Sequence, residues 1–197
     1  MPLRVPDPPA QGLSIVLDAL SSAASQPTTN AAEALREAGA AGLTTAAPHQ
    51  VYFVGLRDLA EGRLLAAAQL KGWRYIIFEG DRPLAAAELS GDEGALDFSN
   101  INRGPFVEST VEGVGRAEVL EVVREEDFEL RLLDIPGLYV TALWLHGPRD
   151  LIIPLPPTRP ELEPFAVYEE EALVERLSGR AEQRLKFDDR PRTEDRR

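Results

Sequence analysis

The chain contains no cysteine and only two histidines among its 197 residues. The lack of cysteine excludes disulfides, thiolate nucleophiles, iron–sulfur clusters and cysteine-ligated zinc. No apolar run reaches the ~18 residues that a membrane-spanning helix needs. The first nine residues also lack the apolar centre of a signal peptide. We therefore expect a cytoplasmic protein that has no membrane partner.

Basic residues are few compared with acidic ones: 21 Lys and Arg stand against 33 Asp and Glu, for a net charge of −12. Such a surface repels nucleic-acid phosphates and anionic lipids, so we expect neither as a partner. Basic proteins, cations and neutral ligands remain compatible with it. Only Lys71 and Lys186 are lysines, and this preference for arginine, with abundant alanine, suggests a GC-rich bacterial genome.

The clearest structural pattern lies in residues 128–155. Apolar and polar residues alternate over 128–132, a Pro-Gly turn follows at 135–137, and an apolar run covers 138–145. A second turn at 146–150 leads into 151–153. Alternation with period two, bounded by proline and glycine, predicts an antiparallel meander.

Further strands are predicted upstream, at 51–54, 73–79, 84–89 and 95–99. Helical spacing and capping residues predict helices at 13–25, 30–39, 58–71 and 169–185. Another helix begins at Pro105, where Gly113 and Gly115 limit its length. Together these elements predict an α+β fold: an antiparallel sheet of five or six strands with helices on one face and flexible termini.

The predicted organisation has four parts. Residues 1–49 form an extended and helical N-terminal segment that is partly mobile, and 50–155 form the α+β core domain. A proline-rich linker and the C-terminal helix occupy 156–185, before a disordered charged tail at 186–197. The C-terminal helix can pack back on the domain or dock on another chain. The PxxP spacing within 154–160 suits a stiff spacer or a polyproline-binding groove.

A polar segment just before Pro105 is the best candidate for ligand binding. Ser99, Asn100, Asn102 and Arg103 supply a hydroxyl, two carboxamides and a guanidinium. They precede an expected helix N-terminus, which favours anions. The alternative is a polar loop whose asparagines satisfy their own backbone.

A second candidate group is His146, Arg149 and Asp150. Asp150 can orient the imidazole and Arg149 can hold an anion, although Gly-Pro-Arg-Asp is also simply a good turn sequence. His49 lies 97 positions from His146, and nothing in that spacing indicates a metal site. We expect no metal and no cofactor.

No nucleophile elbow, Walker loop or dinucleotide fingerprint occurs, and the acidic runs at 125–127 and 169–171 are expected to be solvated faces. We therefore assign no catalytic residue and leave enzymatic activity open. The first functional hypothesis is an acidic, non-enzymatic bacterial protein-binding, accessory or assembly protein. Its partner is a protein, a basic one in particular, and an exposed sheet edge also allows a homodimer. The alternative is a small enzyme or ligand-binding protein that uses the polar loop around Asn100–Arg103.

Overall fold

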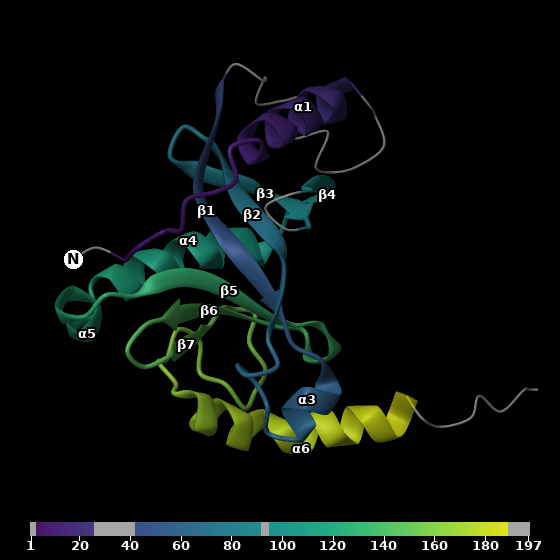
Figure 1. Cartoon of the computed structure of the whole chain (residues 1–197), viewed down its shortest axis with the longest axis vertical. Coiled ribbons are helices and arrows are strands. Elements are labelled where there is room, and N and C mark those ends of the chain that lie inside the picture. Colours follow the sequence, from purple (N-terminus) through teal and green to yellow (C-terminus); the bar gives the residue numbers. More distant parts are fainter. Residues whose placement is uncertain (1–2, 26–41, 92–94, 189–197) are drawn as a thin grey trace, which may run out of the picture.

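The computed structural model describes residues 3–25, 42–91 and 95–188. Its centre is a seven-stranded sheet in the order β4-β3-β2-β1-β5-β6-β7 (Figure 1). Neighbouring strands are antiparallel except β1 and β5, which are parallel. The predicted α+β class is confirmed, with seven strands in place of five or six. The strands are β1 (Leu43–Phe53), β2 (Gln69–Glu79), β3 (Arg82–Ser90), β4 (Asp97–Asn102), β5 (Glu129–Ile135), β6 (Val140–His146) and β7 (Leu151–Pro154).

Helices cover both faces of this sheet, where the sequence predicted one. The helices are α1 (Gly12–Ser25), α3 (Leu56–Ala60), α4 (Pro105–Glu118), α5 (Glu121–Glu125) and α6 (Glu170–Asp188). On β2, Trp73 packs with Val16 of α1, whereas Ile76 packs with Val107 of α4. Side chains alternate between the two faces along a strand, and Trp73 and Ile76 are three positions apart, so they point to opposite faces. Helices α1 and α4 therefore lie on opposite sides of the sheet. Figure 1 shows α1 near one end of the sheet and α3 with α6 near the other.

The C-terminal helix packs back on its own domain. Leu173, Leu177 and Ala181 of α6 are fully buried in a cluster that includes residues of β5, β6 and β7. Their spacing of four residues places them on one helical face. Of the two roles left open for this helix, packing on its own domain is the one that the structure shows.

The predicted meander is confirmed. Strands β5, β6 and β7 pair antiparallel in sequence order, and the short 3-10 helix η2 (Pro136–Leu138) occupies the first predicted turn. The strands predicted at 73–79 and 84–89 correspond to β2 and β3, which pair antiparallel as a hairpin.

The helix predicted at 58–71 is wrong. Helix α3 ends at Ala60, and Gly62 adopts a left-handed φ of 77°. Gly72 lies inside β2, where a Cβ atom would come within 1.9 Å of the carbonyl oxygen of Leu89. This glycine permits close strand approach and does not cap a helix.

Helix α4 runs through both glycines that were expected to limit it. A Cβ on Gly113 would lie 2.7 Å from a side-chain carbon of Leu155 and 3.1 Å from one of Leu143. The glycine thus allows α4 to lie close to the sheet, and this packing outweighs its low helix propensity.

In the N-terminal part, α1 (Gly12–Ser25) confirms the helix predicted at 13–25, whereas the strand that follows differs from expectation. Strand β1 begins at Leu43 and is longer than the strand predicted at 51–54. The helix predicted at 30–39 lies outside the described residues, as does the tail from 189. Residues 186–188 belong to α6. None of the described helices is long and apolar enough to cross a membrane.

Replacement of Leu177 by alanine should lower the free energy of unfolding by about 2–5 kcal/mol, because it leaves a cavity between α6 and the sheet. Urea denaturation measures this loss. Glu182→Ala, at an exposed position of the same helix, is the matched control. Equal stability of the two variants would contradict the packing of α6.

Candidate functional site

The residues predicted as a polar loop lie mostly in an edge strand. Ser99, Asn100 and Asn102 belong to β4, and Arg103 follows it directly. The loop prediction is wrong for the two asparagines, because β3 supplies their strand partners, and Ser99 lies at the register shift between the two strands. Asn100 pairs with Glu88 and Asn102 with Ala86. Paired residues share a face, so both asparagines lie on the face that α4 covers.

A pocket of about 240 Å³ lies where β4 leads into α4. We call it the Arg74 pocket. It contains two of the residues predicted for ligand binding, Asn102 and Arg103. Its lining consists of Arg74, Ile76, Ala86, Asn102, Arg103, Gly104, Pro105, Phe106 and Val107.

Arg74 is the buried charge of this pocket. It projects from β2, is only 9% exposed, and donates from Nε and Nη2 to Oε1 of Glu88 at 3.0 and 2.5 Å. A guanidinium withdrawn from water needs such a partner. Its Nη1 amino group makes no hydrogen bond within the described residues. The pocket therefore contains a preorganised donor.

The start of α4 supplies a second group of donors. Its N-cap is Gly104, which has a φ of 135° and provides no side-chain cap. Pro105 has no N–H, and the amide of Val107 already donates to the carbonyl of Gly104 at 3.0 Å. The Phe106 amide belongs to the first helical turn, whose N–H groups lack intrahelical acceptors. Together with the helix dipole it favours an anion in the pocket.

Two arginines therefore meet at one helix N-terminus. Arg103 lies at the rim, and its Nε is 3.4 Å from the carbonyl oxygen of Leu84. Glu88 forms an ion pair with Arg74. Because the site is partly closed to water, charge-assisted hydrogen bonds to a ligand are stronger there than at an open surface.

A wider hollow of about 510 Å³ adjoins the Arg74 pocket. The two share Arg103, Gly104, Pro105 and Val107, and the hollow continues along the start of β3 to Pro83 and Leu84. A ligand with an anionic head and an organic body can occupy both.

His49 lies opposite Arg74 in the pairing of β1 with β2 and is completely buried. Its Nδ1 lies 2.7 Å from the carbonyl oxygen of Ala47. A carbonyl only accepts, so Nδ1 carries the proton. The buried Nε2 has no hydrogen-bond partner among the described residues. Burial, reinforced by the charge of Arg74, lowers the pKa of His49 to about 4.

Asp134 belongs to the same electrostatic neighbourhood. Burial raises its pKa, while a hydrogen bond from Thr141 at 3.0 Å and the charge of Arg74 act in the opposite direction. The charge of Arg74 thus influences both His49 and Asp134. Since His49 is neutral near neutral pH, Arg74 and Arg103 supply the positive charge that a ligand in the pocket would meet.

Part of this pocket could be predicted from the sequence. Asn102, Arg103 and the helix N-terminus were predicted, whereas Arg74 lies within the strand predicted at 73–79 and was not a candidate. Arg74 could have been noticed in the sequence, because it stands between Trp73 and Tyr75 and shares a strand face with Ile76. A charge on a covered sheet face requires a partner, and Glu88 is 14 residues away in the neighbouring strand.

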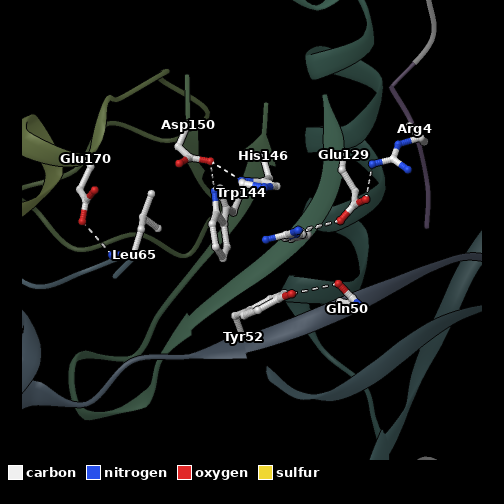
Figure 2. A network of polar contacts seen from close by, with 10 residues as sticks. Arg4, Gln50, Tyr52, Leu65, Glu129, Trp144, His146, Asp150 and Glu170 are labelled. Carbon is white, nitrogen blue, oxygen red and sulfur yellow. Dashed lines mark hydrogen bonds and ion pairs between the residues drawn. The ribbon is translucent and has the colours of Figure 1, made fainter. Parts of the chain in front are cut away.

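The second predicted group forms a structural network at the β6–β7 turn. Oδ1 of Asp150 accepts hydrogen bonds from Nε1 of Trp144 at 2.7 Å and from Nδ1 of His146 at 2.8 Å. Figure 2 shows Asp150 facing both rings. Arg149 points elsewhere, to Glu169 at 3.9 Å. The three predicted residues therefore do not converge on a ligand position.

Arg131 continues this network along the sheet. Its guanidinium lies 4.8 Å from the ring centre of Trp144 and 5.0 Å from that of Tyr52. It also forms an ion pair with Glu129, which Arg4 contacts from the N-terminal segment (Figure 2). These contacts fix β1, β5 and β6 to one another.

The two predicted groups lie far apart in the sheet order. Ser99–Asn102 are in β4 at one edge, and the turn around Asp150 joins β6 to β7 at the other. The structure therefore does not bring His146 or Asp150 to the Arg74 pocket.

Comparisons with family models, curated proteins and solved structures give no match to this chain. Within residues 3–25, 42–91 and 95–188, no three His, Asp or Glu side chains are grouped so that they could hold a metal ion.

His49→Leu should reduce the acid sensitivity of the fold. The unfolded histidine binds a proton near pH 6.5 and the folded one only near pH 4, so the wild type loses stability as the pH falls through this window. The full loss is about 3 kcal/mol. Urea unfolding at several pH values measures it in both proteins. If the free energy of unfolding changed with pH equally in both proteins, the burial of a neutral imidazole would be contradicted.

Asp150→Ala should destabilise the protein by about 1–3 kcal/mol, because the buried indole N–H of Trp144 loses its acceptor. Arg149→Ala, in the same turn, should change the stability by less than about 0.5 kcal/mol. Thermal denaturation compares the two. A larger loss for Arg149→Ala would show that the ion pair, and not Asp150, holds the turn.

Proposed function

We propose that this protein binds a small organic anion in the Arg74 pocket. The proposal rests on the buried guanidinium of Arg74, which lines a cavity that Arg103 and the start of α4 also line. The carboxylate or phosphate of the ligand accepts hydrogen bonds from Nη1 of Arg74, from Arg103 and from the Phe106 amide.

Local charge supports this ligand despite the acidic chain. The net charge of −12 slows the approach of anions at long range, but salt screens that effect beyond roughly 10 Å. Two arginines, Arg74 and Arg103, line the pocket itself. An uncharged organic portion then extends into the hollow beside Pro83 and Leu84.

The lining favours binding over turnover. The nine residues of the Arg74 pocket offer guanidinium, carboxamide and backbone amide donors, and their side chains include no hydroxyl, thiol, imidazole or carboxylate. This composition supports a ligand-binding protein, the alternative derived from the sequence.

Protein binding is the second candidate function. It is favoured by a surface at the C-terminal end of α6, where Arg159 and Arg184 line a pocket and Tyr139 is highly exposed close by.

Isothermal titration with phenyl phosphate, benzoate and inorganic phosphate tests the anion proposal. We expect saturable binding of at least one aromatic anion that weakens with added salt. Arg103→Gln should weaken it about tenfold, because a charge-assisted hydrogen bond to the ligand is lost.

Arg116→Gln is the matched control, since Arg116 lies in the last turn of α4, at the end opposite the pocket, and pairs with Glu112. Its affinity should equal that of the wild type. Absence of binding by all three anions, or equal weakening by both substitutions, would refute the Arg74 pocket as the ligand site.

A further inference from the structure

A basic pocket of about 210 Å³ lies at the C-terminal end of α6, on a chain whose net charge is −12. We call it and its rim the α6 basic surface. It is lined by Gly137, Leu138, Arg159, Arg180, Gln183, Arg184 and Phe187.

Positive charge predominates there. Arg159 is held in place because its Nε donates to the carbonyl of Leu138 at 2.5 Å. Nε of Arg180 lies 3.9 Å from Oε1 of Glu161, a weak and partly exposed ion pair. Arg184 makes no ion pair within the described residues. Among the residues that the structure describes, three guanidinium groups of this surface thus lie near one carboxylate, that of Glu161.

An exposed tyrosine in a strained conformation adjoins these arginines. Tyr139 has a φ of 53° and is 69% exposed, with the guanidinium of Arg159 lying 5.6 Å from the centre of its ring. A bulky residue rarely adopts a positive φ, and the strain costs on the order of 1–3 kcal/mol. Tyr139 ends η2, and its amide donates to the carbonyl of Pro136 at 3.0 Å, so the geometry of this turn accounts for the conformation. The ring itself stays exposed beside Arg159.

A second aromatic ring completes the surface. Phe187 lines the pocket and is 61% exposed. Exposed aromatic rings interleaved with arginines are the composition typical of energetic centres of protein interfaces. A free inorganic anion would need the arginines but gain nothing from the rings.

We propose that the α6 basic surface binds an acidic peptide segment of a partner protein. Its Asp and Glu side chains pair with Arg159, Arg180 and Arg184, and an apolar or aromatic side chain packs between Tyr139 and Phe187. Because this chain as a whole is acidic, it also attracts a partner protein that is basic outside its acidic segment. This inference rests on the protein-binding candidate function.

Selection of short random peptides, displayed on phage, against the full-length chain tests the proposal. We expect enriched peptides that combine acidic residues with an aromatic or apolar residue. Arg180→Glu with Arg184→Glu should weaken their binding about tenfold or more. Arg116→Glu with Arg149→Glu makes the same charge change elsewhere and should leave it nearly unchanged.

Tyr139→Gly separates binding from folding. Glycine accepts a positive φ, so thermal stability should stay equal or rise, while peptide affinity should fall about threefold or more. Enriched peptides that are unaffected by the α6 substitutions would refute this site but retain protein binding. No enrichment would refute both, and neither result touches the Arg74 pocket.

Discussion

The ion pair between Arg74 and Glu88 is the interaction on which the architecture of the α4 face depends. Arg74 projects from β2 and Glu88 from β3, on the sheet face that α4 covers, where an isolated charge would be costly. Removal of one partner alone would leave the other charge uncompensated. The pair joins β2 to β3 and keeps Arg74 aimed along the sheet toward the start of α4. The Arg74 pocket follows from this placement.

The connection from β4 to α4 shapes both the pocket and the packing of the helix. The chain leaves β4 at Asn102, turns at Gly104 and enters α4, which packs across the sheet as far as Leu143. The turn brings the helix N-terminus over Arg74. Gly113 maintains the close approach at the other end of the helix. Gly113, which lowers the helix propensity of this segment, therefore also fits the helix to the sheet.

Much of the fold could be predicted because its signals are local. The meander from Phe128 to Leu155, the hairpin after Trp73 and the C-terminal helix all show clear periodicity bounded by turns. The parallel pairing of β1 with β5 could not be predicted, since its partners are about 80 residues apart. The need for glycine at position 72 could not be predicted for a similar reason, since it comes from the carbonyl of Leu89 in the neighbouring strand. For the site, Asn102 and Arg103 were visible beside Pro105, whereas Arg74 and Glu88 become partners only when two strands pair.

A crystal structure of the full-length chain grown with phenyl phosphate tests the central claim most directly. The account predicts phosphate density between Arg74 and Arg103, within hydrogen-bonding distance of the Phe106 amide, and the phenyl ring toward Pro83 and Leu84. Ordered ligand bound only at another surface, or the pocket empty at a concentration that saturates binding in solution, would contradict it.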